Sequence, residues 1–416
     1  MTRAVPLVAL LLVAANASAE EGFRLRAEGL VDLRLVRADE TATWLDGGLG
    51  KLRWGGEDGD ARTVPALAQA SVVLRAGLGE SLRALVQANV DTGSYPSSGL
   101  AGFDLVEAWA SWRPRLSEAL GLRLKGGHFF PPLSVENDGL AWTATRTLTA
   151  SALNSWIGEE VRVTGLKASV ELFLPTSDLA LTGAVFGGND PTGSLLAWRG
   201  WAVGDRQTGR TDRLPLASLP AFDADGLFPL QDPWVAPFRE VDGRAGWYAA
   251  LSWRLPERLE VRALRYDNRG DLVSLERGQY AWKTAFLSVE ASLRLPAGAE
   301  LLGGWLDGWS AMGAGEAVDA YWRTWFVLAS LELGAHRIAV RWERFDVRDQ
   351  DRHAATDPND EEGEAWTAAW SCEVDRRTKV FLEVVSVDAS RPARVLVGLP
   401  AREKETLVQL AVRGRF

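Results

Sequence analysis

The stretch 405-ETLVQLAVRGRF-416 decides the fold, because two kinds of residue alternate along it. Val408, Leu410 and Val412 fall on one face, and Gln409 and Arg413 fall on the other. A period of two is typical of a β-strand with one apolar and one polar face. We therefore predict a strand here, whose apolar face meets either a protein core or lipid.

The stretch 23-FRLRAEGLVDLRL-35 repeats this alternation and places Arg24, Arg26, Glu28, Asp32 and Arg34 on one face. So many charges need water. In a soluble β-sandwich the charged face would be the outside of the molecule. In a transmembrane barrel it would line the lumen, with the apolar face against lipid.

Alternating segments recur along the chain, and most are close to the roughly 9 to 11 residues that a tilted strand needs to cross a bilayer. Sixteen strands are predicted, at 23–37, 66–78, 82–92, 104–113, 121–129, 157–174, 179–187, 246–255, 258–268, 283–295, 299–307, 322–333, 336–347, 364–374, 378–388 and 405–416. In 157–174 the alternation slips by one residue at Gly165, and a β-bulge there would absorb the slip. Splitting that segment would give seventeen strands and would move the stretch 188–245 to the side of the short turns.

With sixteen strands, short and long connections alternate strictly. The short ones are 77–81, 114–120, 175–178, 256–257, 296–298, 334–335 and 375–377, and the long ones are 38–65, 93–103, 130–156, 188–245, 269–282, 308–321, 348–363 and 389–404. Short periplasmic turns and long extracellular loops are typical of transmembrane barrels. We therefore predict an all-β fold, an antiparallel transmembrane β-barrel of about 16 strands with both termini in the periplasm.

Tryptophans near the strand ends support the same barrel arrangement. Trp112 and Trp253 lie near the short turns, and Trp247, Trp282, Trp309, Trp322 and Trp366 lie near the long loops. We predict that they form two aromatic girdles at the membrane interfaces. Phe416, at the end of an alternating strand, resembles the terminal aromatic by which bacterial outer-membrane barrels are recognised.

The first residues indicate export. Arg3 is followed by an apolar run over 4–15 and by the small-residue pattern 17-ASA-19, so residues 1–19 are predicted to be a cleaved signal peptide and 20–416 the outer-membrane barrel. The formal net charge of -9 argues against a nucleic-acid partner. The single cysteine, Cys372, cannot form an internal disulfide, and so few thiols fit an exported protein.

Catalytic chemistry has little support in the sequence. His128, near the outer end of its strand, is followed within one loop by Ser134, Ser151 and Asn154, which leaves a hydrolase at the rim of the barrel as one alternative. We find no phosphate-binding glycine loop, metal-ligand spacing or serine-elbow pattern, so no cofactor, no metal and no catalytic residue is predicted.

Charged residues on the predicted lumen face are the better functional candidates, because rings of charge near a constriction set the ion preference of a channel. Loop 130–156 is long yet has no charge run, and it is predicted to fold into the barrel as a constriction; packing against other loops or another subunit is the alternative. The predicted pore-lining residues are Arg75, Arg123, Lys125, Glu136, Asp138, Arg146, Glu160, Arg162, Lys167 and Arg341. Loop 188–245 is too apolar to be free in water, and it is expected to cap the mouth or to lie at a subunit contact.

Three runs carry a family resemblance: 125-KGGHFFPP-132 leading to Glu136-Asn137, 154-NSWIGEE-160 and 186-FGGND-190. They resemble the phosphate-selective porin family, a resemblance that implies a sixteen-stranded, usually trimeric outer-membrane channel with a long loop folded inward. Phosphate selectivity in that family depends on a ladder of Arg and Lys. Here the lumen bases are mixed with nearly as many acids, so that substrate is not carried over.

The function expected from the sequence is therefore a porin-like channel for passive diffusion of small polar or ionic solutes, anions included. The expected partners are outer-membrane lipid, lipopolysaccharide and, as a homotrimer, further copies of the chain. A barrel with a structural or adhesive role, which would conduct nothing, remains the alternative beside the rim hydrolase.

Overall fold

The computed structural model describes residues 22–56, 59–90, 103–114, 116–353 and 355–416. The predicted signal peptide, 1–19, and nearly all of the predicted loop 93–103 lie outside the described residues. None of the described helices is long and apolar enough to cross a membrane.

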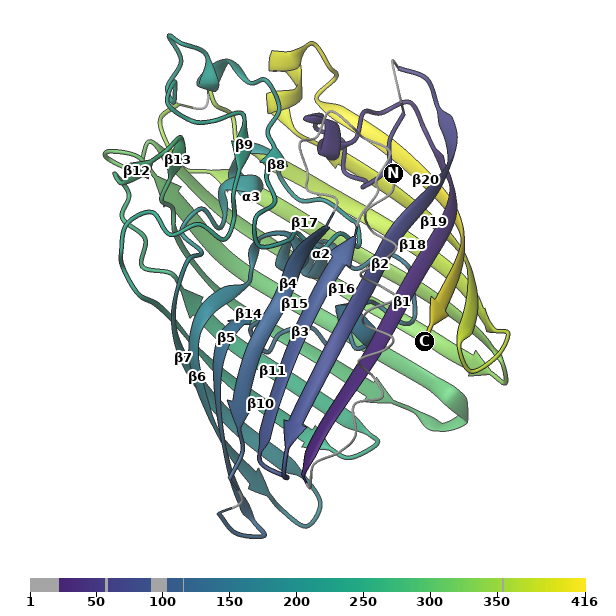
Figure 1. Cartoon of the computed structure of the whole chain (residues 1–416). Helices are drawn as coiled ribbons and strands as arrows, with labels where there is room; N and C mark the ends of the chain where they lie inside the picture. Colours follow the sequence, from purple (N-terminus) through teal and green to yellow (C-terminus); the bar gives the residue numbers. More distant parts are fainter. Residues whose placement is uncertain (1–21, 57–58, 91–102, 115, 354) are drawn as a thin grey trace, which may run out of the picture.

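Sixteen strands form one closed antiparallel barrel, in which each strand pairs with its neighbours along the chain and β20 pairs with β1 (Figure 1). The strands are β1 (Phe23–Ala38), β2 (Arg62–Leu78), β3 (Leu82–Val90), β4 (Phe103–Trp112), β5 (Leu120–Phe129), β6 (Val163–Phe173), β7 (Asp178–Gly187), β10 (Gly246–Leu255), β11 (Leu259–Asp267), β14 (Lys283–Arg294), β15 (Ala299–Met312), β16 (Val318–Leu333), β17 (His336–Asp349), β18 (Glu361–Glu373), β19 (Thr378–Ser390) and β20 (Arg402–Arg415). The predicted fold class is confirmed. We call the two ends of the barrel the short-turn end and the long-loop end.

The seam between β1 and β20 is closed by the last residue of the chain. Gly29 and Phe416 exchange both backbone hydrogen bonds, at N···O distances of 2.9 and 3.1 Å. The Phe416 ring covers Gly29 so closely that a Cβ atom added there would lie 2.0 Å from Cζ of the ring. The absence of a side chain at position 29 therefore makes room for the terminal aromatic.

The first residues of the predicted strand 157–174 are not in a strand, and the predicted bulge is absent. Helix α2 (Ala152–Glu160) occupies this region, with Ser151 as its N-cap, and β6 begins only at Val163 and pairs with β5 without a register shift. Gly165 itself lies inside β6, which pairs with β7 without a register shift as well. The register shifts of the barrel lie elsewhere, between Asp32 and Leu33 and between Gln87 and Ala88.

Several strands extend further at the long-loop end than the sequence indicated. β15 ends at Met312 and β16 begins at Val318, so the predicted long loop 308–321 shrinks to residues 313–317. The cross-strand pairs Ala311↔Asp319 and Met312↔Val318 continue the ladder into the predicted loop.

Segments 39–61, 130–162 and 188–245 contribute apolar side chains to one buried cluster shared with inward-facing strand residues. Helix α2 lies inside the ring of strands, beside β15 and β16 (Figure 1). Seven tryptophans of this cluster are at most 1% exposed: Trp44, Trp54, Trp156, Trp198, Trp201, Trp282 and Trp322. The girdle prediction is therefore wrong for Trp282 and Trp322, because neither side chain reaches the outer surface of the barrel.

The other girdle tryptophans remain on the outside of the barrel. Trp112 and Trp253 are exposed near the short turns, and Trp247 and Trp366 are exposed near the long loops. Trp366 stacks on Trp342 of the neighbouring strand, with ring centroids 5.9 Å apart. These rings border the apolar belt of the barrel, as interface aromatics do.

Candidate functional site in the barrel interior

Residues 130–162 cross the interior and are tied to the opposite wall by buried glutamates. Each of these carboxylates accepts hydrogen bonds from backbone N–H groups of the segment. The pairs are Glu290 with Ser134 and Val135, Glu383 with Leu148 and Thr149, and Glu343 with Ala152, at distances of 2.5 to 3.1 Å. Each of these bonds satisfies a buried backbone donor that would otherwise cost about 1–3 kcal/mol, so the wall fixes the path of this segment.

Basic wall residues complete the attachment by donating to carbonyl groups of the same segment. The pairs are Arg262 with Leu133 and Ser134, Arg341 with Thr149 and Ala150, Arg413 with Ala144, and Lys379 with Thr145, at 2.5 to 3.2 Å. Both donors and acceptors of an irregular backbone are thereby satisfied away from bulk water, where unpaired backbone groups are costly.

Five of the predicted pore-lining residues belong to this segment, and three of them, Glu136, Asp138 and Arg146, precede α2. Glu136 is fully buried and forms an ion pair with Arg341 at 2.7 Å. Arg146 is also buried and makes a bidentate pair with Glu300 at 2.8 and 2.9 Å. Asp138, bound to Arg146 at 2.6 Å, keeps 42% of its side chain exposed. Of these residues, Asp138 is therefore the one that water reaches best.

Lys125 and Lys167 are cross-strand partners on β5 and β6, on the inner face of the wall. Nζ of Lys125 lies 3.7 Å from the ring centroid of Trp109, a cation–π contact, and Nζ of Lys167 lies 5.8 Å from that of Phe129. Among the described residues, neither lysine has a hydrogen-bond or ion-pair partner. The two ammonium groups therefore have no direct ion pair, while the carboxylates of Glu107 and Glu171 act on them at longer range.

The bases nearest to the short turns are paired. Arg123 binds Glu171 at 2.8 Å, and Arg75 binds Glu28 at 2.6 Å while 47% of its side chain stays exposed. Exposed inward-facing residues of this kind show that water reaches the lumen on the short-turn side. The long-loop side of the interior is filled by the buried cluster, so water reaches the interior mainly from one end.

Glu160 and Arg162 are inside the barrel as predicted but not on a strand, since α2 ends at Glu160. Glu160 accepts hydrogen bonds from Trp156 Nε1 at 2.5 Å and from the backbone of Gly193 and Leu195 at 3.2 Å. Burial raises the pKa of Glu160 to about 7. Arg162 lies over the rings of Phe130 and Phe238, and burial lowers its pKa to about 9.

The residues considered for a rim hydrolase do not come together. His128 Nδ1 lies 3.0 Å from Thr164 Oγ1, and its Nε2 is buried with no partner in the described part of the chain. Ser151 and Asn154 bind Glu136 instead, at 2.8 and 3.0 Å. The hydroxyl that meets His128 is thus that of Thr164, and none of the residues considered for the hydrolase is hydrogen-bonded to this histidine in the described part of the chain.

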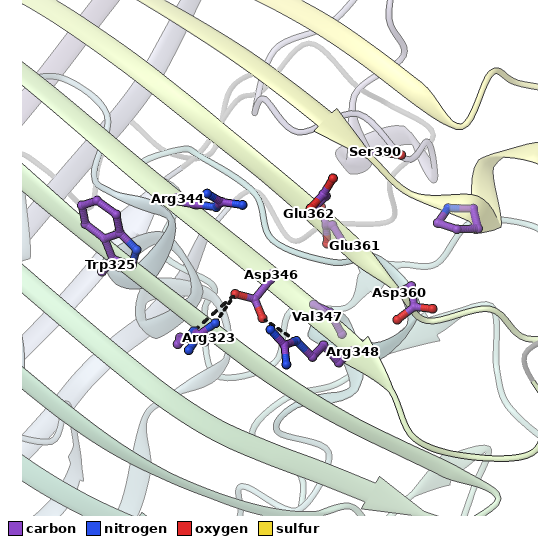
Figure 2. Close-up of a pocket in the computed structure, with 11 residues that line it drawn as sticks. Arg323, Trp325, Arg344, Asp346, Val347, Arg348, Asp360, Glu361, Glu362 and Ser390 are labelled. Carbon is purple, nitrogen blue, oxygen red and sulfur yellow. Dashed lines mark hydrogen bonds and ion pairs between the residues drawn. The ribbon is translucent and has the colours of Figure 1, made fainter.

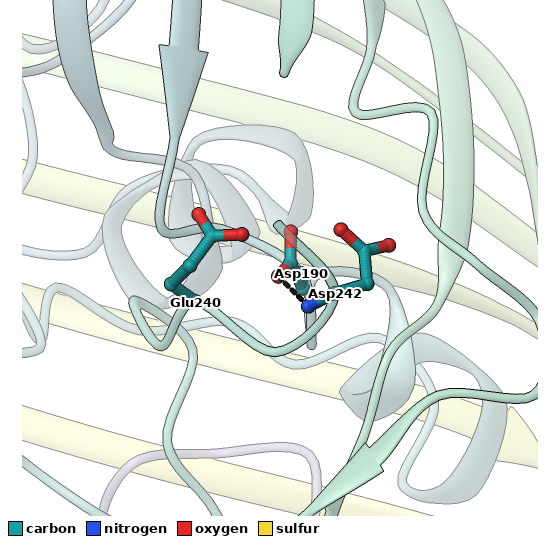
Figure 3. Close-up of side chains that lie close together, drawn as sticks. All are labelled: Asp190, Glu240 and Asp242. Carbon is teal, nitrogen blue, oxygen red and sulfur yellow. Dashed lines mark hydrogen bonds between the residues drawn. The ribbon is translucent and has the colours of Figure 1, made fainter. Parts of the chain in front are cut away.

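Three carboxylates near the two ends of segment 188–245 form a cluster: Asp190, Glu240 and Asp242 (Figure 3). Burial raises the pKa of Asp190 to about 7. Backbone donors already bind these oxygens, because Asp190 accepts from Val241 and Asp242 at 2.5 and 3.2 Å, and Glu240 accepts from Gly188 at 2.6 Å. These hydrogen bonds hold the two ends of segment 188–245 together without requiring a cation.

Sequence reasoning identified Arg341 and Lys125 as inward-facing but did not single out Glu290, Glu343 and Glu383 as attachment points. Alternation gives the face of a residue and says nothing about the loop opposite it. A weak signal was available, since an inward glutamate in a mainly apolar strand segment needs a partner.

No protein family matches this chain, and no curated protein sequence is similar to it. Solved structures are similar in fold. The outer-membrane channel DcaP of Acinetobacter baumannii is 11% identical, with a TM-score of 0.61 over 97% of this chain and 100% of that one. An anion-selective porin from Comamonas acidovorans is 13% identical, with a TM-score of 0.53 over 95% and 100% of the two chains. OmpT of Vibrio cholerae in a trimer form is 8% identical, with a TM-score of 0.50 over 95% and 100%.

Proposed function

We propose that this chain is a porin-like outer-membrane channel for passive diffusion of small polar solutes, with a preference for anions. The observation that carries the proposal is the pair Lys125 and Lys167, two cations without ion-pair partners on the inner wall beside the segment that crosses the lumen. Basic groups without a direct ion pair on the wall of a channel favour anions. A specific phosphate site is not part of the proposal.

Export by a signal peptide at 1–19, contact with outer-membrane lipid and lipopolysaccharide, and assembly as a homotrimer belong to the same proposal. The barrel fold, with its outer apolar belt and aromatic borders, supports the membrane location. The trimer form of the similar Vibrio cholerae structure motivates the expected assembly.

A second candidate is a barrel with a structural or adhesive role that conducts nothing. The packed long-loop half of the interior favours it, because buried side chains from 39–61 and 188–245 occupy the path that a solute would take. For a channel, the same packing predicts a small conductance that depends on movement of these segments.

Planar-bilayer recording of the purified protein separates the two candidates. A channel gives discrete current steps, and a KCl gradient gives a reversal potential on the anion side. Lys167→Gln is expected to shift that potential toward cations, because it removes one lumen charge. The control Arg265→Gln removes one charge from the outer face of β11 and is expected to leave the potential unchanged. An absence of steps would support the non-conducting barrel, and equal potentials in both variants would refute the role of the lysine pair.

A further inference from the structure

The outer face of β16 to β20 has a dense group of charges at the long-loop end. We call it the rim patch: Arg323, Arg344, Asp346, Arg348, Glu362, Glu364, Asp388, Arg402 and Lys404. These residues share the outward phase of Val327, Val340, Leu382 and Leu410, which are exposed apolar residues of the same strands. The patch therefore faces the surroundings of the barrel and not its lumen.

Strand register gives the height of the rim patch on the barrel. Trp342 and Trp366 are cross-strand partners in the aromatic border. The next outward row contains Arg344, Glu364, Asp388 and Lys404, and the row above it contains Arg323, Asp346, Glu362, Ser390 and Arg402. The charges thus begin one step beyond the interface tryptophans, at the height of lipid headgroups.

The charges of the patch are only partly neutralised by one another. Asp346 lies between Arg323 and Arg348, at 3.2 and 3.6 Å, and Asp388 lies between Arg402 and Lys404, at 2.8 and 3.1 Å (Figure 2 shows the first group). The guanidinium group of Arg344 has no ion pair or hydrogen bond among the described residues. Each aspartate thus already serves two bases, and Arg344 remains available to a ligand.

Arg344 also borders two hollows in this surface. One has a volume of about 720 Å³ and is lined by Arg323, Arg348, Glu362 and Ser390 among others (Figure 2). The other has a volume of about 290 Å³ and reaches Asp388 and Arg402. A surface with bases, carboxylates and a hydroxyl along its edges offers partners for phosphates, bridging cations and sugar hydroxyls at once.

We propose that the rim patch binds the phosphorylated sugar headgroup of an anionic glycolipid in the surrounding leaflet. Arg344 takes a phosphate, with Arg323 and Arg402 on either side of it. Glu362 and Glu364 hold a divalent cation that bridges to phosphates of the same or a neighbouring lipid. The inference rests on the proposed outer-membrane location and is independent of conduction.

Binding of bisphosphorylated lipid A to the folded full-length protein in detergent, with Mg²⁺ present, tests the proposal. The double variant Arg344→Gln/Arg402→Gln is expected to bind about tenfold more weakly, which corresponds to about 1.4 kcal/mol. The matched control is Arg265→Gln, an outward arginine at the same end of β11 whose cross-strand partners are Ala249 and Leu287. Equal affinities of the double variant and the control would overturn the proposal.

Four further measurements sharpen the outcome. Inorganic phosphate at the same concentration is expected not to displace the glycolipid, and full displacement would reduce the patch to a simple anion site. Glu362→Gln/Glu364→Gln is expected to abolish the loss of affinity that a chelator causes in the unaltered protein, and an unchanged chelator effect would refute the cation bridge. Each variant is shown to be folded if its gel mobility still changes on heating. Bilayer conductance is expected to be unchanged in these variants, so a failure of this proposal can be told from a failure of the channel proposal.

Discussion

Glu160 is held in an unusual environment for a carboxylic acid, inside the barrel at the end of α2. Its oxygens accept from Trp156 Nε1 and from the backbone N–H groups of Gly193 and Leu195, and the charge of Arg199 also lowers its pKa. Burial outweighs these contacts and favours the protonated form. The packing of α2 against segment 188–245 is therefore expected to depend on the protonation state of Glu160, and so on pH.

The pKa of Glu160 predicts a pH dependence of local stability. The group titrates near 7 in the folded chain and near its ordinary value of 4.5 when exposed, so the folded state binds the extra proton between these values. Its stabilising contribution is full below pH 4.5 and is lost as the pH rises through about 7, an effect of at most about 3 kcal/mol.

Protection factors from hydrogen exchange of residues 152–160 are the measurement. They are expected to fall from pH 5 to pH 8 after correction for intrinsic rates, and Glu160→Gln is expected to flatten the dependence. The same slope in the variant would assign the effect to another group, such as Asp190.

Single residues also show what alternation can and cannot predict. The period of two placed Arg341 on the inner face correctly, because successive strand side chains point to opposite faces. Its partner Glu136 lies 205 positions away in a loop, and no local pattern could connect the two. Faces of residues were predictable, whereas ion-pair partners across the lumen were not.

Among the elements, α2 and the segment leading to it depend on the wall glutamates. Glu383 accepts from Leu148 N, Thr149 N and Thr149 Oγ1, at 2.6 to 3.1 Å. Glu383→Ala would leave these buried donors without an acceptor, at a cost of about 1–3 kcal/mol for each one. We expect at least a tenfold loss of hydrogen-exchange protection at residues 146–150.

The matched control for Glu383 is Glu332→Ala. Glu332 faces the same lumen but is half exposed and pairs with Arg337 on the neighbouring strand, and among the described residues it makes no direct hydrogen bond to the crossing segment. Its removal is expected to leave protection at 146–150 unchanged. Equal losses in both variants would mean that Glu383 does not hold the segment.

Helix α2 was missed for a physical reason. All nine of its residues are buried, so it lacks the polar face by which helices are usually recognised, and residues 157–162 happened to alternate like a strand. The available signal was Ser151, whose side chain accepts from Asn154 N as an N-cap does. Strands were predictable because one of their faces stays in contact with the surroundings.

For the whole molecule, the barrel predicts a strong dependence of stability on depth in the bilayer. Leu382 faces outward between Trp370 and Leu410, and Ser386 lies on the same strand and face in the row of Trp366. Arginine near the bilayer midplane costs about 2–4 kcal/mol, and near the interface about 0–1 kcal/mol. Leu382→Arg is therefore expected to destabilise the barrel far more than Ser386→Arg.

Denaturant unfolding of the protein in phospholipid vesicles measures this difference between Leu382→Arg and Ser386→Arg. A gap of about 2 kcal/mol or more is expected between the two free energies of unfolding. Equal values for the two variants would contradict insertion of this face in lipid.

At this scale the sequence predicted the strand number and the closure, and it predicted the alternation of short and long connections except between β15 and β16, where residues 313–317 form a short turn. It could not predict how much of the interior the loops fill, because apolar loop residues such as Trp198 and Trp201 have the same composition whether they cap a mouth or pack inside it. That outcome depends on the lumen width, which the pairing of all sixteen strands sets together.

The contact between Gly29 and Phe416 also has a kinetic consequence. Every other pair of adjacent barrel strands is also consecutive along the chain, whereas β1 and β20 come from its two ends. Pairing β1 with β20 therefore costs the largest loop-closure entropy. Ring closure is therefore expected to be the last and slowest step of assembly. Until it occurs, β1 and β20 both have unpaired edges. A circular permutant with a linker from Phe416 to Phe23 and new ends in the turn at 375–377 should therefore fold faster and reach the same final barrel.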